Sequence, residues 1–171
     1  MTPAIPVAFA SPSDAADIAA MSRRLIEHGL PWTWRTERVS RAIASPVTNV
    51  AVVRGRAGLD AFGIMEYWDE DAHLVLFAVR PERQRTGLGS ALLDWLEASA
   101  LVAGSTRIRV ESRRDNAAAR SFYNEHGYHE LAIKAQMYSG MQDGIRMEKW
   151  LRVDEPKSPV PGLDQGPPRK A

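Results

Sequence analysis

A glycine-containing turn at residues 84–90 is the strongest chemical signal in this sequence. It reads Q-R-T-G-L-G-S and joins an apolar, β-branched segment to a segment with leucines at helical spacing. The turn is therefore expected to be a helix N-terminus, where backbone N–H groups lack partners within the helix and the helix dipole attracts anions. Gly87 and Gly89 leave this backbone uncovered, and Arg83 and Arg85 add guanidinium donors. These features predict a pyrophosphate-binding turn.

A second segment with chemically useful side chains covers residues 116–128 and reads N-A-A-A-R-S-F-Y-N-E-H-G-Y. Asn116 is suited to cap a helix, and Gly127 is suited to end it in a left-handed conformation. Adjacent helical residues point about 100° apart, so Phe122 and Tyr123 face different surroundings. We expect Phe122 to face a sheet and Tyr123 to reach the edge of a cleft.

The two segments together resemble a known family. The pattern V-x-P-x-x-Q-x-x-G-x-G, beginning at Val79, resembles the acetyl-CoA-binding motif of the GCN5-related N-acetyltransferases (GNAT), and residues 116–128 fit the downstream signature N-x-x-A-x-x-F-Y-x-x-x-G-F/Y. The resemblance covers residues 61–151 and is nearest to the ribosomal-protein alanine N-acetyltransferase branch. It implies acetyl-CoA as cosubstrate, no metal, and direct transfer in a ternary complex to a primary amine of a peptide N-terminus or a small molecule.

The resemblance also assigns residues to acetyl-CoA. In the family, the strand matching residues 73–79 splays from its parallel neighbour, which frees backbone groups for the pantetheine arm and the thioester. Asn116 is expected to contact the pantetheine amides in addition to capping its helix. The expected acetyl-CoA-binding residues are Phe77, Ala78, Val79, Gln84, Arg85, Thr86, Gly87, Leu88, Gly89, Ser90 and Asn116.

Three side chains are candidates for the proton transfers that acetyl transfer to an amine requires. The resemblance gives Tyr123 the role of proton donor to the departing thiolate. Glu111 matches the glutamate base of the ribosomal branch in its segment L-E-V-R-x-x-N, here V-E-S-R-R-D-N. His73 begins the strand on which histone acetyltransferases carry their base. The pKa of an ordinary carboxylate is too low for a good base towards an ammonium, whereas the pKa of an imidazole is nearly matched. Position in the family motif favours Glu111 and pKa favours His73, so both residues stay open as the base. Glu66 is a third option.

Each candidate also has a purely structural interpretation. Glu111 would form an ion pair with Arg109 or Arg113, His73 would be a surface histidine, and Tyr123 would bond to backbone. For the whole chain, the corresponding alternative is a non-catalytic acyl-CoA-binding regulatory module. The presence of both Tyr123 and Glu111 argues against that alternative.

Acceptor recognition in this family comes from the first two helices, their connection and the last hairpin. Trp32 and Trp34 lie in that connection and are candidate walls of an acceptor pocket. Tyr138 stands where N-terminal acetyltransferases often carry paired tyrosines that hold a peptide. The following residues, Q-D-G-I-R-M at 142–147, keep the methionine of the ribosomal branch and lose its acidic pair.

The hydrophobic pattern predicts the elements that position these residues. It predicts helices over 11–28, 37–44, 88–104 and 116–126, and strands over 5–10, 49–54, 61–68, 73–79, 106–112, 128–138 and 145–151. A helix joins the strands that end at Val79 and Ser112, so these two are expected to be parallel. The predicted fold class is α/β (α+β), with a mixed, mostly antiparallel sheet, a splayed parallel central pair and helices on both faces.

Composition limits the remaining choices. The chain has 171 residues, no cysteine and a formal net charge of +1, which argues against disulfides, an acyl-cysteine intermediate and non-specific nucleic-acid binding. We expect one domain over residues 1–152 and a proline-rich disordered tail over 153–171. No apolar run approaches the ~18 residues of a membrane span, so a cytoplasmic protein is expected. Family members often form homodimers through sheet edges, and a homodimer is one arrangement that the resemblance implies.

Overall fold

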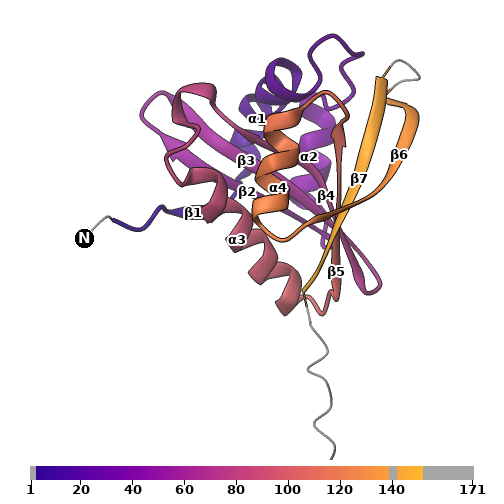
Figure 1. Cartoon of the computed structure of the whole chain (residues 1–171). Helices are drawn as coiled ribbons and strands as arrows, with labels where there is room; N and C mark the ends of the chain where they lie inside the picture. Colours follow the sequence, from indigo (N-terminus) through magenta and orange to yellow (C-terminus); the bar gives the residue numbers. More distant parts are fainter. Residues whose placement is uncertain (1–2, 139–141, 152–171) are drawn as a thin grey trace, which may run out of the picture.

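A seven-stranded sheet with the order β1-β2-β3-β4-β5-β7-β6 organises the chain (Figure 1). The computed structural model describes residues 3–138 and 142–151. Among the described pairings, β4–β5 is parallel and every other neighbouring pair is antiparallel. The strands are β1 (Val7–Phe9), β2 (Thr48–Gly55), β3 (Gly58–Trp68), β4 (Asp71–Val79), β5 (Arg107–Arg113), β6 (His129–Tyr138) and β7 (Gln142–Trp150). The predicted mixed sheet with one parallel central pair is confirmed.

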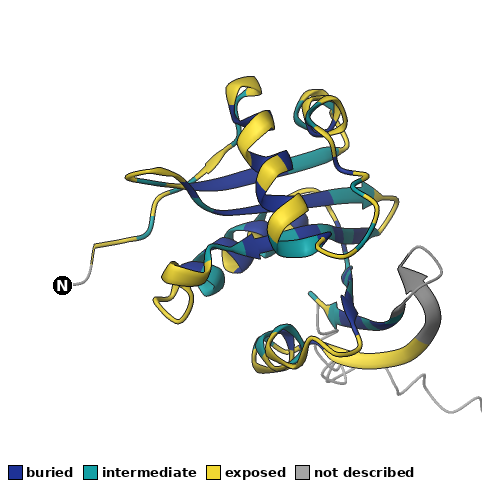
Figure 2. Ribbon diagram, turned by 90° about the horizontal axis from the view of Figure 1, so that it is seen from above, coloured by how far each residue is buried: buried dark blue, intermediate teal, exposed yellow. Residues whose placement is uncertain are grey.

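Helices cover both faces of the sheet, as the sequence predicted, and the strands between them are buried (Figure 2). Helices α1 (Ala15–Met21) and α2 (Thr36–Ala44) pack on one face, called here the α1/α2 face, over a core that includes Phe62. Helices α3 (Leu88–Val102) and α4 (Ala117–Glu125) contribute to a second core on the opposite face. None of the described helices is long and apolar enough to cross a membrane.

The parallel strands β4 and β5 separate halfway along their length. Their register runs from Asp71 opposite Arg107 to Leu74 opposite Val110 and stops there, although β4 continues to Val79 and β5 to Arg113. The splay that the family resemblance implied is therefore present. Beyond Leu74, the edge of β4 that faces β5 has no strand partner among the described residues, which leaves backbone groups available to a ligand.

A β-bulge lies at the point of separation. The pairing with β3 shifts between Met65 opposite Leu74 and Ile64 opposite Leu76, so Val75 is an extra residue on β4. Leu74 consequently packs into the core under α3 and α4, whereas Leu76 packs into the core under α1 and α2. The bulge thus changes which face each later side chain of β4 occupies.

The first long helix differs from its prediction. It was expected to reach His28, but α1 ends at Met21 and a π-helical segment continues only over Ser22–Ile26. The wider π turn is closed by Glu27 N–H donating to the Ser22 carbonyl at 2.7 Å, and a uniform 3.6-residue periodicity does not anticipate it. Gly29 follows with φ +73°, in the left-handed region expected of a residue that stops a helix. The predicted tail over 153–171 lies outside the described residues.

Candidate active site

A cavity of about 380 Å³ opens where β4 and β5 separate. Its walls come from the end of the π-helical segment, the two splayed strands and the first turns of α4. Four of the residues selected from the sequence line it: Phe77, Glu111, Asn116 and Tyr123. These residues lie on three different elements, and the splay brings them together around one space.

The glycine turn has the backbone geometry of an uncovered helix N-terminus. Gly87 is the N-cap of α3 with φ +86°, and Arg85 before it also has positive φ, +60°. A Cβ on Gly89 would lie 3.2 Å from the Phe122 ring, so the turn packs directly on α4. The Leu88 side chain is buried in the core, and this residue therefore offers only its backbone to a ligand.

Several side chains of the turn are engaged within the protein. The Gln84 amide donates to the Val79 carbonyl at 3.2 Å, and the Thr86 hydroxyl donates to the Arg83 carbonyl at 2.5 Å. The Ser90 hydroxyl lies 2.9 Å from His126 Nε2. These bonds shape the turn and leave main-chain N–H groups as its principal anion donors.

The arginines beside the turn differ in their contacts. Arg83 pairs with Asp60 at 3.3 Å. Arg85 is exposed and has no hydrogen bond or ion pair among the described residues, so its guanidinium is available to phosphate oxygens.

The first turn of α4 positions two of the lining residues. Asn116 Oδ1 accepts from the Ala119 N–H at 3.1 Å, which confirms the predicted N-cap. Tyr123 is only 5% exposed and packs against the rings of Phe77 and Tyr128, with centroids 6.2 and 5.5 Å away. It lines the cavity from within the core, and was expected nearer the cleft edge. Phe122 is the less buried of the pair and stacks on Phe77.

Glu111 forms an ionic cluster with two partners. Its Oε2 lies 3.2 Å from His73 Nε2, and its Oε1 accepts from Arg146 Nη2 at 2.9 Å. The partners proposed from the sequence, Arg109 and Arg113, are replaced by Arg146 because β5–β7 pairing places Arg146 directly opposite Glu111. The hydrogen bond from His73 and then the hydrogen bond from Arg146 lower the pKa of Glu111 to about 2, against the opposing effect of burial. Glu111 is therefore a carboxylate at neutral pH.

This lowered pKa predicts a dependence of stability on acid. The pKa of Glu111 falls from 4.5 to about 2 on folding, so its contribution is complete above pH 4.5 and is lost as the pH falls towards 2. That contribution is roughly 3 kcal/mol. Urea unfolding of the wild type and of Glu111→Gln between pH 7 and pH 3 measures it. The difference in the free energy of unfolding between the two proteins should shrink below pH 4.5. A difference that stays constant with pH would contradict the lowered pKa of Glu111.

His73 lies on the α1/α2 face between two strands. It stands opposite Glu66 of β3 and beside Arg109 of β5, and its side chain is 33% exposed. Its Nδ1 has no hydrogen bond among the described residues. When neutral His73 donates from Nε2 to Glu111, the lone pair is on Nδ1 and faces no protein donor.

Two residues that the sequence did not single out hold the loop between the first two helices. Arg113 donates from Nη2 to the carbonyls of Ile26 and His28, at 2.6 and 2.8 Å. Buried Glu27 accepts from the N–H and hydroxyl of Thr33, both at 2.7 Å. The only sequence signal for the structural role of Glu27 was a charged residue near the end of a predicted helix. Arg113 was considered only as an ion-pair partner of Glu111.

The two tryptophans of this loop have different surroundings. Trp34 is buried and lines a second cavity, under a guanidinium of Arg38 that lies 3.9 Å from its ring centre. Trp32 lines neither cavity, and the guanidiniums of Arg23 and Arg35 each lie 5.0 Å from its ring centre. The side chain of Tyr138 lies outside the described part of the chain.

Comparison with known proteins agrees with the geometry. The family model described as acetyltransferase (GNAT) family matches residues 26–128. The [ribosomal protein bS18]-alanine N-acetyltransferase of Escherichia coli K12 is 31% identical over 126 residues, which are 70% of this chain and 81% of the relative.

Solved structures share the fold. The ribosomal-protein-S18-alanine N-acetyltransferase of E. coli superposes with a TM-score of 0.69 at 25% identity, covering 89% of this chain and 97% of the other. The yncA protein of Salmonella typhimurium, solved with acetyl-CoA, has a TM-score of 0.73 at 21% identity, with coverages of 90% and 97%. PaiA N-acetyltransferase of Thermoplasma acidophilum, solved with coenzyme A, has a TM-score of 0.72 at 17% identity, covering 85% of this chain and 98% of the other. The chain therefore belongs to the GNAT family of N-acetyltransferases and is an acyltransferase.

Proposed function

We propose that this protein transfers the acetyl group of acetyl-CoA to a primary amine bound in the same complex. The observation that carries the proposal is the cavity between splayed β4 and β5, with Tyr123 on one wall and Glu111 on another. The free edge of β4 leads from this cavity to the glycine turn before α3. One continuous path therefore joins the glycine turn, which is the proposed anion site, to Tyr123 and Glu111.

Acetyl-CoA is proposed to lie along this path. Its pyrophosphate would bind the N–H groups at the start of α3, and its pantetheine arm would follow the unpaired edge of β4 at Phe77 towards Asn116. The structural relatives solved with acetyl-CoA and coenzyme A support a CoA thioester as the donor. At Ala78 and Val79 the backbone would be the contacting group, because the Ala78 side chain is buried in the α1/α2 core and the Val79 side chain packs against the core on the opposite face.

The reaction forms a C–N bond between the neutral amine and the thioester carbonyl carbon and breaks the C–S bond. We propose that the proton lost by the amine nitrogen passes to Nδ1 of His73, and that Tyr123 protonates the departing thiolate. Glu111, held ionised, accepts the Nε2–H of His73 and stabilises the imidazolium that forms. A carboxylate with a pKa of about 2 is too weak a base to take this proton itself.

An amine panel tests the proposed function. Release of the CoA thiol from acetyl-CoA is measured with peptides and small primary amines, and mass spectrometry identifies the acetylated product. A peptide with an N-terminal alanine is the first acceptor to test, because a relative is named for that activity. Stabilisation of the fold by acetyl-CoA without transfer to any amine would instead favour a non-catalytic acyl-CoA-binding module.

Replacement of Tyr123 by phenylalanine tests the proton donor. We expect kcat to fall by about 10- to 100-fold, the lower part of the range for acid catalysis, because a thiolate already leaves readily near neutral pH. Tyr128→Phe is the matched control, since this neighbouring hydroxyl donates to Glu97 and does not line the cavity. Thiol release at saturating acetyl-CoA measures both. A kcat for Tyr123→Phe within twofold of the wild type would exclude this role.

A further inference from the structure

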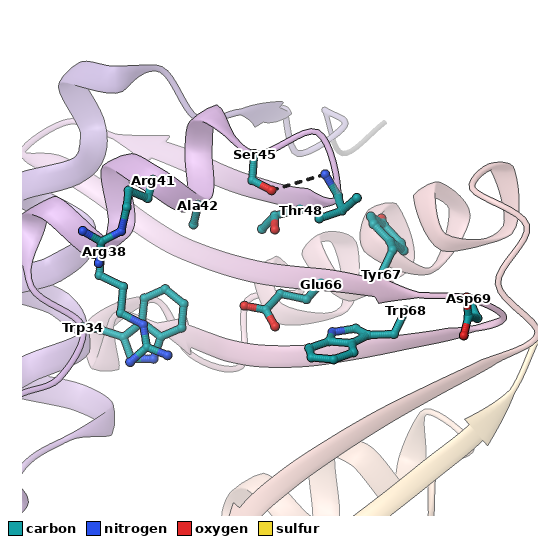
Figure 3. A pocket seen from close by; sticks show the side chains of 11 residues that line it. Trp34, Arg38, Arg41, Ala42, Ser45, Thr48, Glu66, Tyr67, Trp68 and Asp69 are labelled. Atoms are coloured by element: carbon teal, nitrogen blue, oxygen red, sulfur yellow. Dashed lines mark hydrogen bonds between the residues drawn. The ribbon is translucent and has the colours of Figure 1, made fainter.

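A second and larger cavity, about 660 Å³, lies between α2 and the ends of β2 and β3 on the α1/α2 face. Figure 3 shows the side chains that line it, with Trp34 and Arg38 at one end, Trp68 and Asp69 at the other, and Glu66 between them. The proposed mechanism uses none of these residues. We refer to this space as the Glu66 cavity.

The Glu66 cavity lies next to the proposed base through Glu66, and His73 itself lines neither of the two cavities. Glu66 of β3 stands directly opposite His73 of β4, and directly opposed residues of an antiparallel pair project from the same face. Their Cβ atoms are then about 4.5–5.5 Å apart. His73 contacts Glu111 on its other side. An acceptor whose amine reaches His73 would therefore extend its far end towards Glu66.

The carboxylate of Glu66 is left without a partner. It is only partly exposed, and it makes no hydrogen bond or ion pair among the described residues. Its side chain points towards the indole of Trp34, and the exposed indole of Trp68 lies on its other side (Figure 3). A partly desolvated carboxylate flanked by aromatic rings is complementary to a cation that carries N–H donors.

The cavity also contains positive charge. The guanidinium of Arg38 lies over the Trp34 ring, 3.9 Å from the ring centre, and Arg41 is exposed on α2. These two arginines would favour an anionic ligand. Among the charged residues that line this cavity, Glu66 is nevertheless the one directly opposite His73, so the far end of an acceptor that enters the cavity meets Glu66 before it meets α2.

We propose that the Glu66 cavity selects acceptors that carry a second positive charge, a guanidinium or an ammonium, roughly 5–8 Å from the reacting amine. This inference rests on the proposed function. It names a substrate class, amines with a cationic far end, and makes Glu66 the residue that recognises that charge.

Three matched acceptors test the inference. Agmatine, its urea analogue 4-ureidobutylamine, and 6-aminohexanoate each carry one reactive amine. At the same distance from that amine, they carry a cationic, a neutral and an anionic group, respectively. We expect kcat/KM to be about tenfold higher for agmatine than for the urea analogue. Glu66→Gln should reduce this ratio to about one. Glu70→Gln removes one negative charge from the nearby β3–β4 turn outside the cavity and should leave the ratio unchanged.

The outcomes separate the two proposals. If peptides are better acceptors than small amines, three peptides make the same comparison. They carry arginine (cationic), citrulline (neutral) or glutamate (anionic) as the residue after the N-terminal one. Equal kcat/KM for the cationic and neutral acceptors, or a cationic preference that survives Glu66→Gln, would overturn the inference alone. Preference for the anionic acceptor would overturn it in favour of Arg38 and Arg41. Absence of transfer to every acceptor would overturn the proposed function, and this inference with it.

Discussion

Replacement of His73 by glutamine is expected to lower kcat for acetyl transfer by about 10²- to 10³-fold. A glutamine amide still donates a hydrogen bond to Glu111, 3.2 Å from the present Nε2, so the ionic cluster with Arg146 is retained. The amide has no lone pair that accepts a proton near neutral pH. The variant therefore removes proton acceptance and keeps the surrounding charges. Thiol release from acetyl-CoA measures kcat with the best amine of the panel.

Glu111→Gln is the matched variant for this experiment. The amide oxygen of the new side chain still accepts from His73, but the negative charge that stabilises the imidazolium is lost, so we expect a decrease in kcat that is smaller than the decrease for His73→Gln. The pH profiles of kcat should differ as well. Glu111→Gln should keep a rise of kcat with increasing pH, because the proposed base is still present, and His73→Gln should lose that rise. A larger decrease for Glu111→Gln than for His73→Gln would assign proton acceptance to Glu111.

Introduction of glutamate at Gly87 is expected to abolish binding of CoA. Gly87 has φ +86° and caps the helix whose N–H groups are proposed to hold the pyrophosphate, so a carboxylate here would occupy and repel the anion site. At a CoA concentration one hundred times its Kd, the free energy of unfolding of the wild type should increase by about 2.7 kcal/mol. In a domain of this size, that corresponds to a rise in Tm of roughly 5–10 °C. The variant should show no rise.

Gly104→Glu controls for the backbone strain of the substitution. Gly104 has φ +88°, almost the same as Gly87, and a Cβ there would meet no atom within 4 Å. It follows the C-terminal end of α3, far from the proposed phosphate site. Both variants should lose similar stability without ligand, but Gly104→Glu should keep the shift in Tm with CoA. Equal shifts in the two variants would remove the glycine turn from the binding site.

The order of the elements along the chain and the glycine turn were predictable because local patterns define them. A continuous run of apolar and β-branched residues identifies β4, and the burial of its residues alternates along the strand. Asn116 was predicted to cap α4 because a short polar side chain bonds the N–H three residues on, and it does so at 3.1 Å. The splay was expected from the family motif alone, since no residue of β4 demands it.

The end of the first helix and the contacts of the two tryptophans were not predictable in this way. The π-helical segment at Ser22–Ile26 shifts the register of hydrogen bonds, so the helix ends before His28. Trp32 and Trp34 are two residues apart and looked equivalent in the sequence. Packing of α2 against the sheet places Trp34 in the Glu66 cavity, and Trp32 lies outside both cavities.

The sequence by itself determined the family, the order of the elements and the glycine turn that begins α3, because these depend on residues within one turn or one strand of each other. Tertiary structure decided the chemistry of the site. Arg146 reaches Glu111 across 35 residues through β5–β7 pairing, and His73 reaches it across 38 from β4. Only this convergence lowers the pKa of Glu111, and the pairing of β3 with β4 sets Glu66 opposite His73, because the energy of a charge depends on its neighbours in space.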